Sequence, residues 1–226
     1  FVSPVIAYYI SKENPKLCTV LTDDEKETLR RLSRETWAYF EDFVNEKNNY
    51  LAPDNYQEDP SNGVAPRTSP TNMGMGLTSN LAAYDLGYIG LYQVVERTDK
   101  IMTSMEGLTM LRGHFYNWYD TITKEPLYPR YVSTVDSGNL AGYLWVMAEA
   151  LEEYIDNPLI MEKQAAGLSD TLRLAENELK VIDSKSDFYC ENIKELNSME
   201  FNIINWRKSL SKLWSKAIKI EKTEGF

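Results

Sequence analysis

Apolar side chains recur at intervals of three and four residues between Leu29 and Val44. That spacing places them on one face of an α-helix, which then needs a packing partner. The preceding Thr22 is followed three residues later by Glu25, and this pair of side chains can cap a helix start reciprocally. The pattern therefore predicts an amphipathic helix that begins at Thr22 and ends near Lys47.

Three further helices are expected in the middle of the chain, over residues 71–86, 90–111 and from Asp136 or Ser137 to about Ile155. Gly87 and Gly113 follow the first two, and glycine commonly stops a helix because it adopts the left-handed backbone conformation at little cost. Small side chains in the first of these helices favour the close approach of a neighbour. The first two are therefore predicted to form a helical hairpin.

Prolines separate the predicted helices. Four of the twenty residues in 51–70 are proline, a density that excludes both a helix and a central strand. Long loops without regular structure are uncommon in compact domains and are usually functional or disordered. The tyrosine, amides and acids of this loop favour a function. Pro126 and Pro129 break a second segment into a loop or a short strand pair.

No proline follows Pro158, and an apolar seam runs from Ala165 to Ile220. Its steps alternate between three and four residues with an interruption at Ser186, which is typical of coiled-coil helices. One long helix or a hairpin folded at residues 183–187 would both satisfy this spacing. The hairpin is the preferred interpretation, because turn-forming residues coincide with the interruption and an internal partner buries both halves of the seam.

The composition narrows the classes of function. The formal net charge is −10 and 43% of the residues are hydrophobic, so the chain can build a core but suits neither nucleic acid nor an anionic membrane. Cys18 and Cys190 show no metal-binding or redox spacing and are interpreted as free thiols in a reducing compartment, so no metal site is expected. His114 is the single histidine, which leaves carboxylates as the expected acid and base groups.

The charge is unevenly distributed along the chain. Residues 51–150 carry eleven acidic and six basic side chains, whereas residues 159–226 carry eleven of each. The acidity therefore lies in the part that bears the long loops. At the other end, residues 1–10 are apolar but fewer than the roughly 20 that span a bilayer. Because the chain starts without Met, this stretch is interpreted as the end of an upstream membrane segment or as an interfacial segment.

Aromatic, amide and carboxylate side chains are concentrated between Arg112 and Gly142. Six aromatic residues occur in 113–131 and alternate with polar ones, so complete burial would leave many polar groups without partners. Sugar sites combine flat aromatic faces with polar side chains that bind neighbouring hydroxyls. The candidate binding residues are Arg67, Asn117, Trp118, Tyr119, Asp120, Asp136 and Asn139.

Simpler interpretations remain open for each of these groups. The aromatic cluster would suit a packed core, and Asp136 can cap the helix that follows it. Glu58 and Asp59 in the proline-rich loop are adjacent, which is unfavourable for an acid and a base that act on one glycosidic bond. A solvated loop or an ion pair with Arg67 accounts for that acidic pair equally well. His114 is expected to be structural.

Four blocks of this sequence resemble, in the same order, the central region of cyclic β-1,2-glucan synthases. They are residues 53–60, 67–72, 112–121 and 129–142. The resemblance covers about residues 22–170 and adds Asn72 to the candidate binding residues. The string Ser133-Thr-Val-Asp136 is similar to one that precedes a helix in related β-1,2-glucanases, which marks Asp136 as a cleft residue. Residues 3–10 resemble the family's connection to its membrane-embedded part.

The resemblance implies an all-α fold. Residues 22–158 would form part of an (α/α)6 barrel of helical hairpins with long polar loops, after a linker over residues 1–21. Residues 159–226 would form a coiled-coil-like helical hairpin appended to this barrel. An incomplete barrel would expose an apolar flank, which the appendage or a dimer partner could cover.

The function implied by the resemblance is the synthesis and cyclisation of β-1,2-glucan by transglycosylation within a large inner-membrane enzyme. This chain would itself be soluble, lie on the cytoplasmic side and supply glucan-binding subsites next to the remaining domains. It would need no cofactor, because UDP-glucose would be used by a separate upstream domain. The nucleophile and acid/base of a retaining mechanism are expected outside the chain, which would be inactive alone. The alternative is a non-enzymatic helical module that self-associates through residues 165–220.

Overall fold

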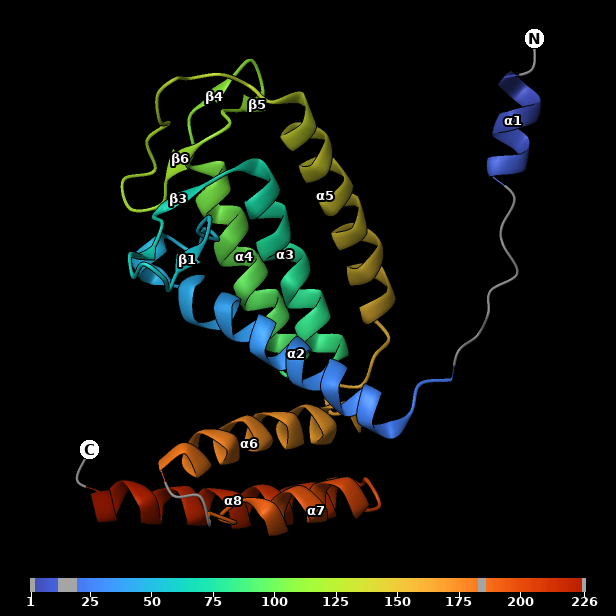
Figure 1. The fold of residues 1–226 in the computed structure, drawn as a ribbon, viewed down its shortest axis with the longest axis vertical. Coiled ribbons are helices and arrows are strands. Elements are labelled where there is room, and N and C mark those ends of the chain that lie inside the picture. Colours follow the sequence, from blue (N-terminus) through green and yellow to red (C-terminus); the bar gives the residue numbers. More distant parts are fainter. Residues whose placement is uncertain (1–2, 12–19, 183–185, 225–226) are drawn as a thin grey trace.

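The computed structural model describes residues 3–11, 20–182 and 186–224, and this part of the chain is predominantly helical (Figure 1). The predicted all-α class is therefore confirmed. The long helices are α1 (Ser3–Ile10), α2 (Asp23–Phe43), α3 (Pro70–Asp85), α4 (Leu91–Glu106), α5 (Thr134–Tyr154), α6 (Lys163–Ile182), α7 (Cys190–Ser198) and α8 (Ile203–Glu224). We refer to residues 20–158, with α2 to α5, as the body and to residues 159–224, with α6 to α8, as the appendage.

Helix α2 begins where the sequence predicts. The Thr22 hydroxyl accepts a hydrogen bond from the Glu25 backbone N–H at 3.3 Å, and the Thr22 N–H donates to the Glu25 carboxylate at 2.7 Å. This capping box satisfies two N–H groups that would otherwise lack partners. A short 3-10 helix (Glu46–Asn48) follows α2, and Asn49 and Tyr50 then take left-handed backbone angles, with φ of 50° and 56°. Helix α2 itself ends at Phe43, earlier than the predicted end near Lys47, because the chain continues into this short 3-10 helix and turn.

Helix α3 is the centre of the body. Its Met73 and Leu77 have no exposed surface. The neighbouring α4 runs antiparallel to α3 and forms the predicted hairpin with it. Helix α5 runs parallel to α3, because Thr71 contacts Asp136 near the starts of the two helices and Tyr84 contacts Tyr154 near their ends. Two helix N-termini therefore lie at the same end of the body (Figure 1).

The helix predicted over residues 90–111 is shorter, because it ends at Glu106. Beyond it, β4 (Met110–Leu111) pairs antiparallel with β5 (His114–Phe115). Arg112 and Gly113 form the two-residue turn between them, with φ of 52° and 83°. Such a turn needs positive φ at both central positions, which glycine tolerates. The prediction that Gly113 closes the helix was therefore wrong, since Gly113 closes a hairpin.

Short strands tie the loops to the body. Strand β1 (Tyr56–Gln57) pairs with β2 (Gly63–Val64) inside the proline-rich loop. Strand β3 (Arg67–Thr68) pairs antiparallel with β6 (Tyr119–Asp120), which joins this loop to the aromatic segment. Both loops are thereby held at the end of the body where α3 and α5 begin (Figure 1).

The starts of α3 and α5 differ slightly from the predicted positions. Ser69 caps α3 by accepting from the Asn72 N–H at 3.2 Å. Ser133 caps α5 by accepting from the Asp136 N–H, also at 3.2 Å. Asp136 and Ser137 therefore do not cap α5, because the chain already supplies a serine one turn earlier. The carboxylate of Asp136 is free to face α3 instead.

The appendage contains three helices, so the predicted two-helix hairpin is wrong in its second half. Helix α7 ends at Ser198, and the Asn202 side chain accepts from the backbone N–H groups of Ile204 and Asn205, at 3.1 and 2.9 Å, to start α8. The break between α7 and α8 therefore divides the second half of the predicted apolar seam between two helices. On α8, Trp206 is only 9% exposed, whereas Ile203 is 60% exposed. One apolar stripe of α8 packs inward and a second one faces outward.

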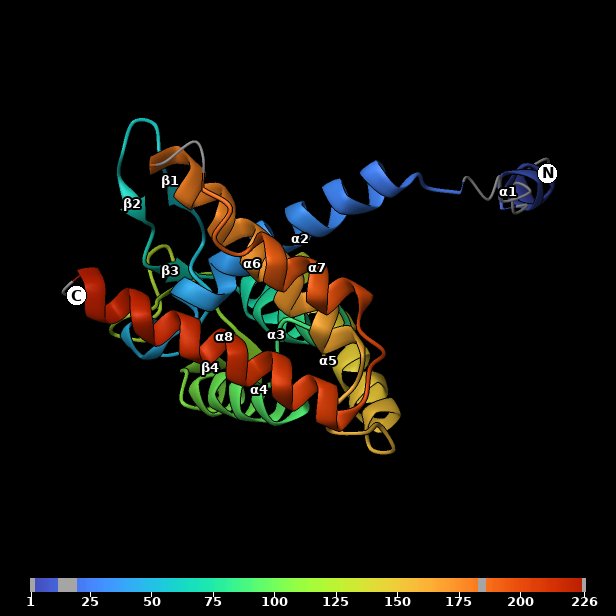
Figure 2. The same ribbon diagram turned by 90° about the horizontal axis from the view of Figure 1, so that it is seen from below.

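The appendage joins the body through a close backbone crossing between α6 and the turn after α3. Seen from below, α6, α7 and α8 lie in front of the body (Figure 2). Gly167 on α6 lies against the Gly87 carbonyl after α3, and a Cβ atom at Gly167 would collide with that backbone group. Two ion pairs flank the crossing, with Arg30 to Asp170 at 2.7 Å and Arg173 to Glu27 at 2.7 Å. The junction therefore depends on a glycine crossing and on charge pairs.

Some expectations fall beyond the part of the chain that the structure describes, namely Cys18 with the linker residues 12–19, residues 183–185 of the predicted turn and the side chain of Ile220. Helix α1 buries no residue. Among the described residues, no helix combines the length and the apolar character needed to cross a bilayer.

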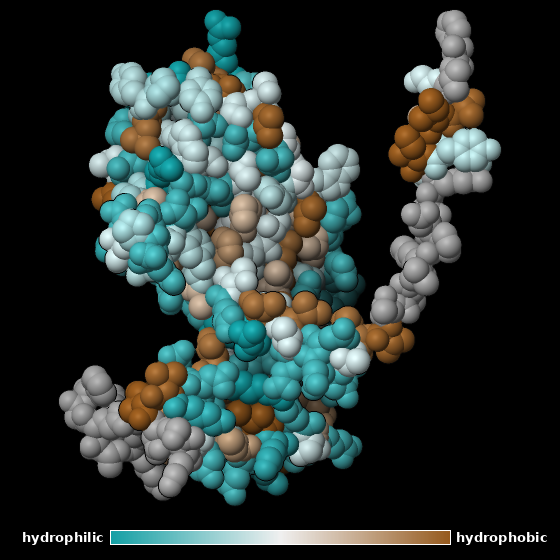
Figure 3. Space-filling view, viewed as in Figure 1, coloured by the Kyte–Doolittle hydropathy of each residue, from teal (hydrophilic) through white to brown (hydrophobic). Residues whose placement is uncertain are grey.

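Apolar surface is nevertheless exposed along α2, near the boundary between the body and the appendage (Figure 3). On α2, Leu29 is 50% exposed and Leu32 is 46% exposed. Both line an open groove of about 590 Å³ against α3 and α5. The body therefore has one flank that is not fully covered.

Candidate functional site

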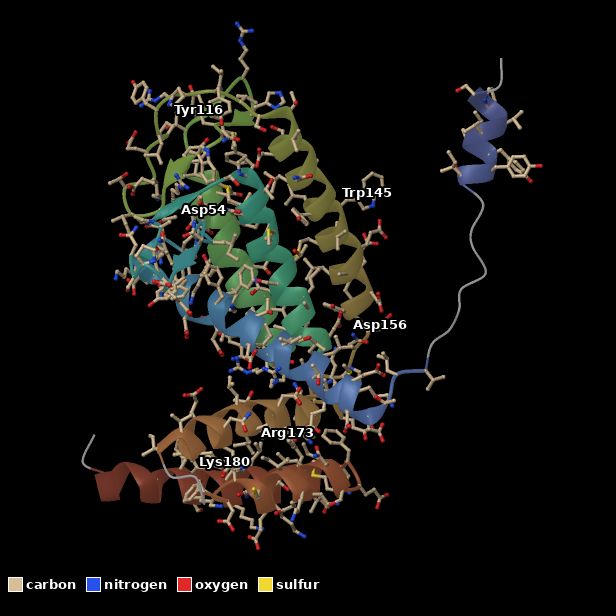
Figure 4. All side chains as sticks on the ribbon, in the orientation of Figure 1. Asp54, Tyr116, Trp145, Asp156, Arg173 and Lys180 are labelled. Atoms are coloured by element: carbon tan, nitrogen blue, oxygen red, sulfur yellow. The ribbon has the colours of Figure 1, made fainter. Side chains whose placement is uncertain are left out.

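The candidate site lies where the N-termini of α3 and α5 meet the loops that precede them. Thr71 and Asn72 come from the first turn of α3, and Asp136 comes from the first turn of α5. Asp54 reaches the same region from the proline-rich loop, as its label shows in Figure 4. Residues that are up to 82 positions apart are therefore gathered around two helix starts.

Asp136 is the centre of the site and is partly buried. One of its carboxylate oxygens accepts a hydrogen bond from the Thr71 hydroxyl at 2.7 Å. The Thr71 oxygen in turn accepts from the Asn139 amide at 3.1 Å. The N-termini of α3 and α5 also direct partial positive charge towards this carboxylate. The arrangement holds Asp136 in one orientation and favours its ionised form.

The pKa of Asp136 lies below its ordinary value. Partial burial acts in the opposite direction and would raise this pKa, but hydrogen bonds from Ser133, Thr71 and Ser69 stabilise the carboxylate and outweigh burial. Asp136 is therefore ionised at neutral pH. An ionised carboxylate accepts hydrogen bonds from hydroxyl groups and cannot serve as a proton donor.

Asn117 connects Asp136 to the aromatic segment. With its amide oriented so that donors meet acceptors, its NH₂ group donates to Asp136 Oδ2 at 3.0 Å. Its oxygen accepts from Trp118 Nε1 at 2.6 Å and from the Tyr131 hydroxyl at 2.7 Å. Because Asn117 is 6% exposed, this network leaves little freedom to the ring of Trp118.

The guanidinium of Arg67 covers the ring of Trp118, with its central carbon 4.7 Å from the ring centroid. The same guanidinium donates to Asp54 Oδ2 from Nε at 3.0 Å and from Nη2 at 2.8 Å. Asn72 reaches the other oxygen of Asp54 at 3.4 Å. Trp118 is thus fixed through its ring nitrogen and through the Arg67 guanidinium, and it remains half-buried.

The structure brings six of the eight candidate residues into this network, namely Arg67, Asn72, Asn117, Trp118, Asp136 and Asn139. Tyr119 is different, because it has no exposed surface. Its hydroxyl donates to the Thr109 carbonyl at 2.7 Å and accepts from the Tyr116 N–H at 2.8 Å. Its ring presents no face to a ligand, so its role is structural, as the core-packing interpretation predicted.

Asp120 also lies outside the network. Its carboxylate accepts from the backbone N–H groups of Ile122 and Thr123, both at 2.8 Å. These bonds hold the turn after β6 and direct the side chain away from Asp136. Asp120 therefore shapes the loop, and its link to the other candidates is the backbone pairing of β6 with Arg67 on β3.

The acidic pair of the proline-rich loop is exposed. Glu58 and Asp59 both lie at the surface, and Arg67 forms its ion pair with Asp54, at 2.8 Å, and not with either of them. This arrangement fits a solvated loop. Among the described residues, no cluster of three His, Cys, Asp or Glu side chains could hold a metal ion.

Sequence reasoning missed three members of the site, namely Asp54, Thr71 and Tyr131. Asp54 follows a proline in a loop, where an acid usually reads as a turn residue. Thr71 stands at a helix start, where hydroxyl groups usually act as caps. The sequence offered one signal for Asp54. Arg67 on β3 and Asn72 at the start of α3 both carry hydrogen-bond donors that suit an acidic partner.

The site can therefore bind a polyhydroxylated ligand. Two carboxylates, Asp54 and Asp136, offer acceptors, whereas Arg67, Asn72 and Asn139 offer donors beside an aromatic ring. This combination is typical of sites for neutral sugars, in which hydroxyl groups need both donors and acceptors. Both carboxylates are already engaged by side-chain donors, which suits binding better than bond cleavage.

On this all-α fold, the polar and aromatic side chains at the converging helix N-termini have the chemistry that is typical of sugar-binding sites. No protein-family model matches the chain. The chain is 38% identical over 182 residues to the cyclic β-(1,2)-glucan synthase NdvB of Rhizobium meliloti (strain 1021). This match covers 78% of the chain but 6% of the length of NdvB. The resemblance to cyclic β-1,2-glucan synthases is therefore confirmed, for a small part of such an enzyme.

Solved structures with a similar course of the chain have low sequence identity to it. An endo-β-1,2-glucanase from Chitinophaga pinensis has a TM-score of 0.49 and 21% identity, over 70% of this chain and 37% of that protein. A protein of Bacteroides fragilis described as a candidate glucoamylase has a TM-score of 0.48 and 22% identity, over 72% of this chain and 38% of that protein.

Proposed function

We propose that this chain supplies a glucan-binding wall in an enzyme that synthesises or cyclises β-1,2-glucan by transglycosylation. The observation that carries the proposal is the network of Asp136, Asn117 and Trp118, which fixes an aromatic ring beside an ionised carboxylate. The similarity to NdvB, over 78% of the chain, supports the choice of glucan as the ligand.

The chemistry of the site favours binding over cleavage. A retaining transglycosylase needs a nucleophilic carboxylate and an acid/base carboxylate about 5 Å apart. Asp136 is held by Thr71 and Asn117, and Asp54 is held by Arg67 and Asn72. We assign the reacting carboxylates to other parts of the larger enzyme, together with the use of UDP-glucose and the attachment to the cytoplasmic side of the inner membrane.

The arrangement of the helices supports a part of an (α/α)6 barrel. Helix α3 packs against its hairpin partner α4 and against the parallel α5. The open groove along α2, α3 and α5 is the apolar flank that an incomplete barrel would leave. The alternative of a non-enzymatic interaction module is not favoured. The outward apolar stripe of α8 is the feature that supports self-association through residues 165–220, and light scattering would detect such self-association.

Calorimetry with linear β-1,2-glucooligosaccharides tests the proposal on the chain of residues 1–226. We expect Trp118→Ala to weaken binding by about tenfold or more, because stacking on a sugar and the Arg67 contact are both lost. Tyr128→Ala is the matched control, since this tyrosine is 81% exposed and belongs to the same segment. The control should bind as the unchanged chain does.

Two results would contradict the proposal. The first is that the unchanged, folded chain does not bind the oligosaccharides. The second is that both variants lose binding equally, which would indicate an effect on the loop as a whole. Circular dichroism before each titration verifies that the variants keep their helices.

A further inference from the structure

A second hollow lies in the junction of the body and the appendage, on the face of α2 that meets α6 and α7. Its volume is about 290 Å³. Arg31 and Arg34 reach it from α2, Arg173 and Lys180 from α6, and Lys194 from α7. Figure 4 shows Arg173 and Lys180 on α6, on the side of the molecule away from the glucan site. In an acidic chain, this gathering of basic side chains needs an explanation.

Three carboxylates also line the pocket, and each already has a donor. Glu27 pairs with Arg173 at 2.7 Å and Asp170 pairs with Arg30 at 2.7 Å. Glu176 is 2% exposed and accepts from the Tyr189 backbone N–H at 2.7 Å. These contacts hold the three carboxylates in place, and none of them forms an ion pair with a lysine of the pocket lining.

The arginines and the lysines of the pocket differ in their ion pairs. Arg31 and Arg34 form ion pairs with Glu35 and Glu41, both at 2.8 Å. Lys180 and Lys194 form no ion pair within the described ranges of the chain. The lining has five basic side chains and three carboxylates, and with the ion-pair partners Arg30, Glu35 and Glu41 there are six basic groups and five acidic ones. The two free lysines therefore favour an anion.

Two of the residues that line the pocket each have a buried polar atom that lacks a partner within the described part of the chain. One is a donor, Nη1 of Arg34, whose side chain is 10% exposed. The other is an acceptor, Oε1 of Glu176. Buried groups of this kind are costly unless something satisfies them. A ligand that suits both atoms must accept hydrogen bonds and must also donate one.

We propose that this pocket binds inorganic phosphate. Phosphate keeps at least one O–H at neutral pH, which can donate to the Glu176 carboxylate. Its remaining oxygens can accept from Lys180, Lys194 and Arg34 in charge-assisted hydrogen bonds. Sulfate has no proton at this pH, so the carboxylate would repel it. Bound phosphate would join α2 to α6 and α7 and would strengthen the junction between body and appendage.

The test is the thermal unfolding of the full chain, with isothermal titration at about pH 7.5 and ionic strength matched with sodium chloride. We expect phosphate to raise the melting temperature and sulfate to have no effect beyond that of chloride, because ligands that bind the folded state stabilise it. Lys180→Ala with Lys194→Ala should weaken phosphate binding by about tenfold, since two charge-assisted bonds are lost.

The control removes the same charge elsewhere. Lys47 and Lys208 are exposed, and neither lines this pocket, so Lys47→Ala with Lys208→Ala should leave phosphate binding unchanged. Glu176→Gln should allow sulfate to bind about as well as phosphate, because an amide can donate to either anion. Methyl phosphate distinguishes an ester from the free anion, since its dianion has no proton and should bind weakly.

The proposal fails if phosphate stabilises the chain no more than chloride does. It also fails if sulfate binds as tightly as phosphate to the unchanged chain, or if the control pair loses as much affinity as the pocket pair. The lysine pair decides the question even if Glu176→Gln does not fold, because both lysines lie at the surface.

Discussion

The body and the appendage differ in how completely their cores are buried. The core of the body centres on α3, where Met73 and Leu77 have no exposed surface. The core of the appendage is smaller and retains 4 to 9% exposure at its residues Ala165, Leu172, Leu196 and Trp206. The appendage also buries polar side chains such as Glu176 and Asn192, at 2 and 3% exposure. Apolar burial dominates in the body, whereas the described residues of the appendage include five buried polar or charged side chains and four buried apolar ones.

This difference explains where a precise site can form. The loops at the end of the body are anchored to helices that pack against a mainly apolar core, so Trp118 and Asp136 keep fixed orientations. The pocket at the junction is built from long charged side chains on three helices. A rigid scaffold suits shape-specific binding, whereas a charged junction suits an ion that adjusts its stability.

Removing core volume should have the largest effect and should separate the two regions. Leu77→Ala leaves a cavity at a position with no exposed surface, and we expect a loss near the upper part of the about 2–5 kcal/mol range for such changes. Leu196→Ala, in the thinner core of the appendage, should lie near the lower part. Denaturant unfolding followed by tryptophan fluorescence measures both. Equal losses would contradict the contrast between the cores.

The glycine crossing should give an intermediate effect. Gly167→Ala places a methyl group against the Gly87 carbonyl, and forcing the backbones apart should cost about 1–3 kcal/mol. Gly142→Ala is the control, because a Cβ atom there meets nothing within 4 Å and alanine stabilises a helix interior by about 0.5–1 kcal/mol relative to glycine. Limited proteolysis between the body and the appendage should accelerate for Gly167→Ala alone. Equal cleavage of the two variants would show that the crossing does not hold the junction.

Acidification should give the smallest effect, and it acts on the body. The folded pKa of Asp136 is lowered relative to an unfolded value of about 3.9. The unfolded state then binds the proton more readily, so the stabilisation is present above that value and is lost as pH falls through the folded pKa. Unfolding in urea at about pH 5 and about pH 3 should show a smaller pH dependence for Asp136→Asn than for the unchanged chain. Parallel slopes for both would contradict the assignment.

Local signals in the sequence predicted the helices well where a cap or a stop is unambiguous. Thr22 and Glu25 form the predicted capping box. At Gly113 the same kind of signal misled, because a glycine with positive φ closes a hairpin as readily as a helix. The break before α8 depends on the Asn202 side chain, which the apolar seam conceals, since its spacing continues across the break.

The site was predictable in part. Residues in dense, chemically unusual strings, such as Asn117 and Trp118, could be found from the sequence, and Asp136 was marked by its string before a helix. Asp54 could not be identified from the sequence, because the pairing of β3 with β6 and the fold of the proline-rich loop determine which side chains it contacts. Tyr119 was misassigned because alternation along a two-residue strand, which decides burial, is too short to read from a sequence.

The two helix starts beside Asp136 have a consequence for how this site can diversify. Their partial charges belong to the peptide backbone, so no side-chain substitution removes them while α3 and α5 persist. Neighbouring residues such as Asn72 and Asn139 can change, and with them the ligands that are accepted, without loss of this backbone field, which acts on Asp136 together with its hydrogen bonds. The fold therefore determines the electrostatic character of the site, and the neighbouring side chains and loops determine which ligands it accepts.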